Sequence, residues 1–105
     1  MNASPSVTLT SMLPQGVLPR SVLEQLRSLA NLGDAPVSTY LYCPDTAAQQ
    51  AKRLRAALPD WADLFYAVKA NSFPPVLAAL AREVDGFEVA SHREAELATS
   101  AAAMP

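Results

Sequence analysis

The chain has 105 residues, of which 50% are hydrophobic and 17% charged, and its formal net charge is −2 at pH 7. This composition is typical of a globular protein, and without a basic stripe we expect no nucleic-acid partner. Cys43, the single cysteine, cannot form an internal disulfide, and we expect no metal site. No apolar run approaches the ~18 residues of a membrane span. The first charge is Arg20, so a basic signal-peptide start is missing, and we expect a cytoplasmic protein with no membrane partner.

The N-terminal region, residues 1–35, is predicted to hold an arm and a helix. Residues 1–19 contain three prolines and one glycine and show no long periodicity, which is typical of an extended arm. Ser21 and Glu24 have the spacing of a capping box, in which the hydroxyl accepts an amide proton and the carboxylate reaches back. Apolar residues then recur at helical spacing as far as Gly33, where we expect the helix to stop.

A short strand and a second helix are predicted next. Residues 39–42, TYLY, are β-branched and aromatic enough to be a strand candidate. Thr46 and Gln49 repeat the capping-box spacing and are followed by an apolar helical stripe. We expect this helix to end at Pro59, because proline cannot continue it.

The pattern is clearest from residue 64 onward. Residues 64–68, LFYAV, form a continuous apolar run, which is typical of a strand covered on both faces. Ser72 is a candidate N-cap, and the two prolines at positions 74 and 75 suit the first turn of a helix. An apolar stripe follows and closes at Asp85 and Gly86.

A second unit of the same kind follows. Residues 87–90, FEVA, are a second strand candidate. Ser91 and Glu94 form a third capping box, which opens an alanine-rich helix that runs to about residue 102. The order strand, helix, strand, helix with short links predicts an α/β fold with right-handed parallel βαβ geometry. A (β/α)8 barrel needs about 250 residues and eight such units. We therefore expect a fragment of a larger α/β protein, with a small complete domain as the alternative.

Lys69 is the leading candidate for chemistry. It directly follows the most apolar predicted strand, so it is expected at the carboxyl edge of a parallel sheet, where barrel enzymes keep their active residues. An activated lysine amine attacks carbonyl carbons. The alternative is that Lys69 marks the end of the strand and points at water.

Residues 65–72, FYAVKANS, resemble the lysine signature of the fold type III pyridoxal-phosphate enzymes, most closely the ornithine/diaminopimelate/arginine decarboxylase family. Residues 86–91, GFEVAS, with Glu94 resemble the second strand and helix start of that family. The resemblance covers about residues 36–105. It implies that this range is the start of a pyridoxal-phosphate-binding, alanine-racemase-like (β/α)8 TIM-type barrel, preceded by the arm and helix of residues 1–35.

The resemblance also implies roles for two residues. The matching lysine of the family forms the internal aldimine, a Schiff base, with pyridoxal 5'-phosphate, so Lys69 is the expected catalytic and cofactor-binding residue. The acidic residue of the family near that lysine corresponds to Glu88, where aspartate is commoner. Glu88 is therefore expected to lie close to the cofactor.

The implied function is that of a pyridoxal-phosphate-dependent amino-acid decarboxylase, a lyase with a small amino-acid substrate and a homodimeric full-length form. The 105-residue segment alone is expected to be inactive, because the other site residues of the family lie further along the chain. An alanine-racemase-like enzyme is the first alternative, but Ser72 and Phe73 stand where the racemase signature continues with a Tyr-Gly-His-type run. The second alternative is a truncated, non-catalytic relative with a binding or regulatory role.

Overall fold

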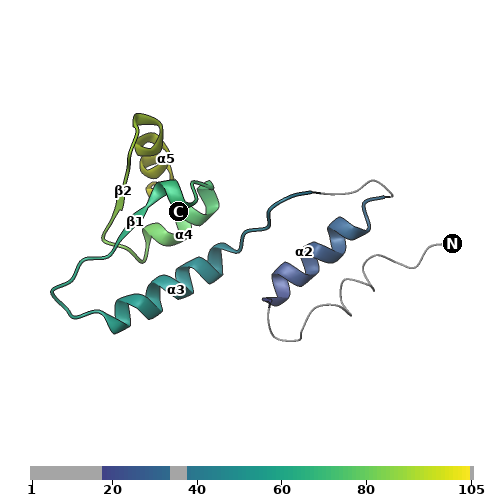
Figure 1. The fold of residues 1–105 in the computed structure, drawn as a ribbon, viewed down its shortest axis with the longest axis horizontal. Coiled ribbons are helices and arrows are strands. Elements are labelled where there is room, and N and C mark those ends of the chain that lie inside the picture. Colours follow the sequence, from purple (N-terminus) through teal and green to yellow (C-terminus); the bar gives the residue numbers. More distant parts are fainter. Residues whose placement is uncertain (1–17, 34–37, 105) are drawn as a thin grey trace. The chain divides into compact units, whose positions relative to one another are not determined.

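The computed structural model describes residues 18–33 and 38–104. Its elements are α2 (Arg20–Ala30), α3 (Pro44–Ala57), β1 (Phe65–Ala67), the 3-10 turn η1 (Val68–Ala70), α4 (Pro74–Ala81), β2 (Gly86–Glu88) and α5 (His92–Ala102) (Figure 1). The chain divides into two compact units, Met1–Tyr42 and Cys43–Pro105. Nearly all of the predicted arm lies outside the described residues. None of the described helices has both the length and the apolar character to span a bilayer.

Helix α2 forms where a helix was predicted, but its expected capping box is wrong. The N-cap is Pro19, so Ser21 lies inside the helix, and no side chain caps the first turn. The Pro19 carbonyl accepts the amides of Val22 and Leu23, which closes the turn through the main chain. Glu24 instead pairs with Arg20, with Nε and Oε1 3.3 Å apart.

The strand predicted for residues 39–42 is wrong. The described residues 38–43 have no regular secondary structure. The rings of Tyr40 and Tyr42 stack on each other instead, with centroids 6.3 Å apart and planes 7° apart. A strand needs a neighbour to complete its hydrogen bonds, and among the described residues these have no paired strand.

Helix α3 begins earlier than predicted, at Pro44 with Cys43 as N-cap, so the capping box at Thr46 is also wrong. Proline is favoured in the first helical turn, because its missing N–H has no partner to lose there. The Thr46 hydroxyl donates to Cys43 Sγ at 3.2 Å. The helix ends at Ala57, just before Pro59, as expected.

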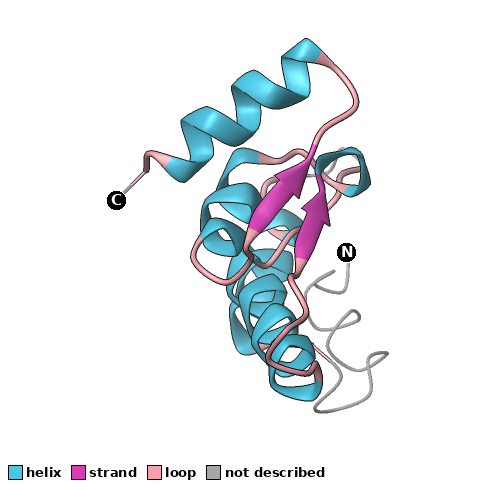
Figure 2. Ribbon diagram, turned by 90° about the vertical axis from the view of Figure 1, so that its left-hand side faces the viewer, coloured by secondary structure: helices cyan, strands magenta, loops and turns pink. Residues whose placement is uncertain are grey.

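The two strands form a parallel pair, which confirms the predicted βαβ arrangement. Their partners in register are Phe65 with Gly86, Tyr66 with Phe87, and Ala67 with Glu88. The two arrows in Figure 2 point the same way, with helix α4 connecting them along the chain. Each strand has three residues, fewer than predicted, and β2 starts one residue early at Gly86 and ends two residues early at Glu88.

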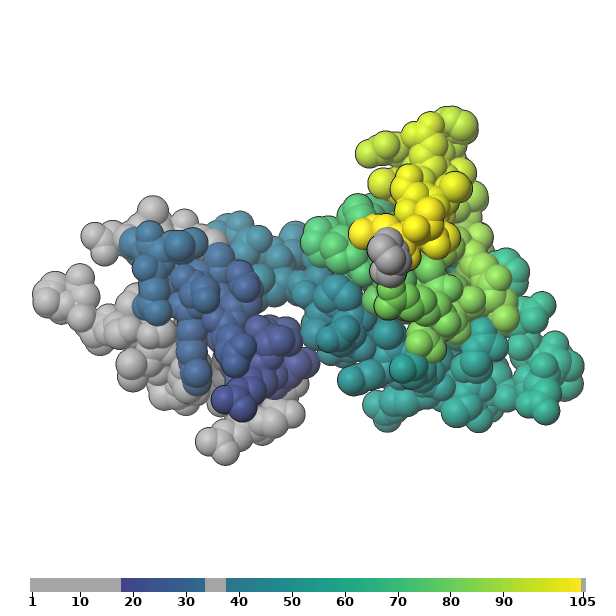
Figure 3. Space-filling view, turned by 180° about the vertical axis from the view of Figure 1, so that it is seen from behind, coloured from purple at the N-terminus to yellow at the C-terminus, as the bar shows by residue number. Residues whose placement is uncertain are grey.

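The three helices of the second unit pack together, with α4 contacting both α3 and α5. Figure 3 shows the yellow end of α5 against the green surface of α4. Phe73 is the N-cap of α4 instead of the predicted Ser72, and the two prolines occupy the first turn as expected. Among the residues that the structure describes, the buried hydrophobic side chains form two clusters, one of Val68, Leu77, Ala98 and Ala101 and one of Ala51, Val76 and Leu80.

Only one face of the sheet is covered by the described residues, although burial on both faces was predicted. Tyr66 and Phe87 pack against both core clusters, so their face lies on the helices. Phe65 alternates with Tyr66 along β1 and is 57% exposed. A Cβ added to Gly86 would lie 2.6 Å from the Phe65 ring, so this ring lies over Gly86 on the open face.

Asp85 ties the start of both strands to helix α3. Its carboxylate accepts the Leu64 amide at 2.7 Å and Arg55 Nη2 at 2.8 Å, and its own amide donates to the Leu64 carbonyl at 2.8 Å. The hydrogen bond from the Leu64 amide, followed by that from Arg55, lowers the pKa of the Asp85 carboxyl below its usual value. Arg55 also donates to the Glu83 carbonyl at 3.0 Å, so this contact fixes the loop that leads into β2.

Candidate functional site

Lys69 lies in turn η1, directly after the last residue of β1. Its neighbour Val68 is completely buried in the core cluster with Leu77, whereas Lys69 itself is exposed. Among the described residues, no hydrogen bond or ion pair engages the Lys69 amine. Burial of Val68 therefore anchors the main chain while the amine one residue later stays available.

Three hydrogen bonds order the turn that carries Lys69. The Asn71 amide donates to the Val68 carbonyl at 3.2 Å, which closes η1. The Tyr66 hydroxyl donates to the Asn71 carbonyl at 3.0 Å, and the Phe73 amide donates to Asn71 Oδ1 at 3.0 Å. The two ends of the turn that contains Lys69 are thus joined by both main-chain and side-chain contacts.

Glu88 is the last residue of β2 and pairs in register with Ala67, two residues before Lys69. Because the strands are parallel, their carboxyl ends meet at one edge of the sheet, and the structure places Lys69 and Glu88 at this edge. Glu88 is exposed, and within the described part of the chain it forms no ion pair with Lys69. Their role in catalysis or cofactor binding stays a prediction.

The loop that follows Glu88 is held by the start of α5. The Glu94 amide donates to Ser91 Oγ at 3.1 Å, and the Ala90 amide donates to Glu94 Oε1 at 2.8 Å. This confirms the third predicted capping box, with the carboxylate reaching the amide one residue before the N-cap. Glu94 thereby fixes the chain two residues after Glu88.

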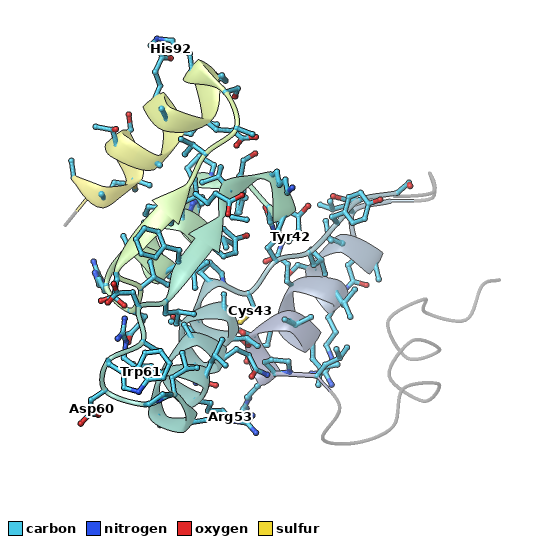
Figure 4. The ribbon with its side chains drawn as sticks, turned by 60° about the vertical axis from the view of Figure 1, so that its left-hand side comes forward. Tyr42, Cys43, Arg53, Asp60, Trp61 and His92 are labelled. Atoms are coloured by element: carbon cyan, nitrogen blue, oxygen red, sulfur yellow. The ribbon has the colours of Figure 1, made fainter. Side chains whose placement is uncertain are left out.

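His92 opens α5 on its outer side and points away from the sheet (Figure 4). Its Nε2 lies 3.0 Å from Glu96 Oε1 on the same helix, and its side chain is exposed. A histidine at the start of a helix is more often a surface residue than a catalytic one, and the exposed position of His92 agrees with a surface role.

Sequence reasoning missed Tyr66 and Asp85. The apolar run predicts only a strand position for Tyr66, but the Tyr66 hydroxyl reaches across the lysine-bearing turn. The pattern predicts only a helix end at Asp85, but the Asp85 carboxylate joins the loop before β1 to α3. A tyrosine in an otherwise apolar buried run was the available signal, because a buried hydroxyl needs a partner.

The groups at this edge fit a cofactor that carries an aldehyde. A primary amine condenses with an aldehyde to form an imine, and Lys69 presents such an amine without a competing partner among the described residues. A carboxylate close to an imine favours its protonated form, and Glu88 supplies a carboxylate at the same edge. The donor set is therefore one amine in the turn that follows β1 and one carboxylate at the end of the adjacent strand β2.

Comparison with known proteins gives the family. Residues 45–105 match the family described as "Pyridoxal-dependent decarboxylase, pyridoxal binding domain". The chain is also similar to 2-[(L-alanin-3-ylcarbamoyl)methyl]-2-hydroxybutanedioate decarboxylase of Staphylococcus aureus (strain NCTC 8325 / PS 47), with 34% identity over 73 residues. That match covers 70% of this chain and 17% of the relative. No solved structure matches the chain significantly.

The family match covers more than half of the chain and includes β1, η1, α4, β2 and α5. It contains both residues that the sequence singled out, Lys69 and Glu88. The predicted cofactor, pyridoxal phosphate, is confirmed, because the matching family domain is a pyridoxal-binding one. The chain belongs to the pyridoxal-dependent decarboxylase family, and residues 45–105 lie in its pyridoxal-binding domain.

Proposed function

We propose that this chain is the N-terminal part of a pyridoxal-phosphate-dependent amino-acid decarboxylase, with Lys69 forming the internal aldimine. The observation that carries the proposal is the position of Lys69 and Glu88 at the shared carboxyl edge of β1 and β2, inside the matched residues. In a barrel enzyme this is the edge that holds the active site. We further propose that the two βα units are the first two of a (β/α)8 barrel.

The role of each residue in this site follows from the chemistry of its functional group. When bound, pyridoxal phosphate supplies an electron sink for the bond that breaks at the substrate Cα. Lys69 holds the cofactor covalently through its side-chain amine. The negative charge of Glu88 favours the protonated form of that nitrogen. Asn71 and Val68 keep the Lys69 main chain in its turn.

A decarboxylase is favoured over an alanine-racemase-like enzyme. Both the matching family and the curated relative are named as decarboxylases. The name of the relative contains an L-alanin-3-yl group, so its substrate carries an amino-acid group. We propose that the substrate here is a small molecule with an α-amino acid group. We also propose that the full-length protein is a cytoplasmic homodimer.

The proposed attachment site predicts a specific covalent adduct. Borohydride reduction of the full-length protein with bound pyridoxal phosphate is expected to fix a pyridoxyl group on Lys69. Trypsin does not cut at a modified lysine, so the modified peptide should run over residues 56–82, from the cut after Arg55 to that after Arg82. Mass spectrometry of this peptide measures the result.

Lys52 provides an internal control, because it is the only other lysine of the 105 residues and is also exposed. Its amine lies 3.6 Å from Glu83 Oε1 and is expected to stay unmodified. An adduct at Lys52 with residues 56–69 and 70–82 recovered as separate unmodified peptides would refute the role of Lys69. A protein with no adduct at all would favour the non-catalytic alternative.

Replacing Glu88 by glutamine is expected to change the protonation of the bound cofactor. The substitution keeps the side-chain volume and removes the negative charge, so the protonated imine loses a stabilising neighbour. The pH midpoint of the visible absorbance change should therefore fall in Glu88→Gln relative to the unmodified protein. Parallel pH titrations of the two proteins measure this shift.

The melting temperature should separate this effect from a loss of folding. Glu88 is exposed and has no hydrogen-bond or ion-pair partner among the described residues, so its replacement should change stability by no more than about 0.5 kcal/mol. Glu96→Gln is the matched control, since it removes an equal charge that pairs with His92 on the outer side of α5. Equal midpoints in Glu88→Gln and the unmodified protein would remove Glu88 from the site.

A further inference from the structure

Tyr66 connects the core to the turn that carries Lys69. Its ring packs against both hydrophobic clusters and meets the ring of Phe87 edge-on, with centroids 6.2 Å apart and planes at 84°. Its hydroxyl donates to the Asn71 carbonyl at 3.0 Å. One side chain thus spans the turn, from the middle of β1 to the residue that follows η1.

We propose that Tyr66 is a positioning residue, which sets the direction of the Lys69 side chain by holding the far end of its turn through the hydroxyl. This inference rests on the proposed attachment of the cofactor to Lys69. The near end of the turn is already fixed, because Val68 is completely buried. Lys69 and Ala70 are exposed, so packing does not fix them, and the hydrogen bond to Asn71 is the core's polar link to the end of this segment.

The hydroxyl can act as a donor throughout the neutral pH range. Partial burial raises the pKa of Tyr66 above its ordinary value, because the charged phenolate would lose hydration. The proton is therefore retained under physiological conditions. The acceptor is also well oriented, because the Asn71 side chain accepts the Phe73 amide and is held by the start of α4.

Tyr66→Phe tests this inference because it removes the hydroxyl and keeps the ring against Phe87. We expect the variant to bind pyridoxal phosphate about three- to tenfold more weakly, the range that the loss of one hydrogen bond produces. The visible circular dichroism of the bound cofactor should also change, since it depends on how the cofactor is held. Absorbance and dichroism titrations of the full-length apoprotein with pyridoxal phosphate measure both effects.

Hydrogen exchange of the apoprotein provides a readout that needs no cofactor. If the Tyr66 hydroxyl holds the turn, amides of residues 69–72 should exchange faster in Tyr66→Phe, while those of α5 stay unchanged. Tyr40→Phe is the matched control, because Tyr40 is 84% exposed and its variant should match the unmodified protein in every measurement. A purely structural role would instead lower the melting temperature and leave cofactor affinity, dichroism and local exchange unchanged.

The outcomes separate this inference from the proposed function. If the wild-type protein forms no adduct at Lys69, the proposed function is refuted and, with it, the role of Tyr66 toward the cofactor. An adduct at Lys69 together with unchanged affinity and exchange in Tyr66→Phe would refute the inference alone. Weaker binding and faster exchange of residues 69–72 would support it.

Discussion

Lys69→Ala is expected to abolish covalent attachment of pyridoxal phosphate and to lower the decarboxylation rate by several orders of magnitude. The variant has no amine at the carboxyl end of β1, so it forms no imine from which a substrate amine could displace the lysine. The visible absorbance band of the bound cofactor and the borohydride-stable adduct in residues 56–82 should both disappear. Absorbance spectra, peptide mass mapping and steady-state rates measure these changes.

Lys69→Arg distinguishes the amine from its charge. Arginine keeps a positive charge at this position, but its guanidinium stays protonated and does not serve as the nucleophile. We therefore expect the same loss of the adduct in this variant as in Lys69→Ala. Both variants should fold normally, because Lys69 is exposed and makes no hydrogen bond or ion pair within residues 18–33 and 38–104.

Lys52→Ala is the control for removing a lysine. Its surface ion pair with Glu83 contributes at most about 1 kcal/mol, so the variant should keep the absorbance band, the adduct and the rate. Retention of the band in Lys69→Ala, with the pyridoxyl group on another residue, would contradict the assignment.

The order of elements could be read from the sequence because local patterns specify it. The capping box at Ser91 formed as predicted. A hydroxyl and a carboxylate three residues apart can accept the free amides at a helix start without any distant partner. The capping boxes at Ser21 and Thr46 did not form. In both regions a proline with its fixed φ, Pro19 or Pro44, lies at the start of the helix. The helix therefore begins before the hydroxyl that was expected to cap it.

Features that depend on distant contacts were not predictable in the same way. The strand expected at residues 39–42 is absent because pairing, and not composition, makes a strand. For the site, the sequence could place Lys69 after a strand and Glu88 in the next one. It could not show that the Tyr66 hydroxyl reaches Asn71, because this contact depends on how the Tyr66 ring packs against Phe87.

The packing beneath the lysine-bearing turn predicts the largest effect on stability. Leu77 on α4 is completely buried and lies in one cluster with Val68, the residue before Lys69, and with Ala98 and Ala101 of α5. Leu77→Ala would leave a cavity between η1, α4 and α5 that the small alanines of α5 cannot fill. We expect a loss of about 2–5 kcal/mol in the free energy of unfolding.

Two further variants make this result specific to packing. Leu77→Met keeps most of the volume and should cost less than about 1.5 kcal/mol. Leu54→Ala removes the same atoms from a side chain on α3 that is 50% exposed, so its cost should be well below that of Leu77→Ala. Urea denaturation of the full-length apoprotein measures all three, with the midpoint falling and the slope unchanged.

Equal costs for Leu77→Ala and Leu54→Ala would show that the Val68 cluster does not support the turn. A larger cost for Leu77→Ala, together with faster amide exchange at residues 68–70, would show that the position of Lys69 depends on this core.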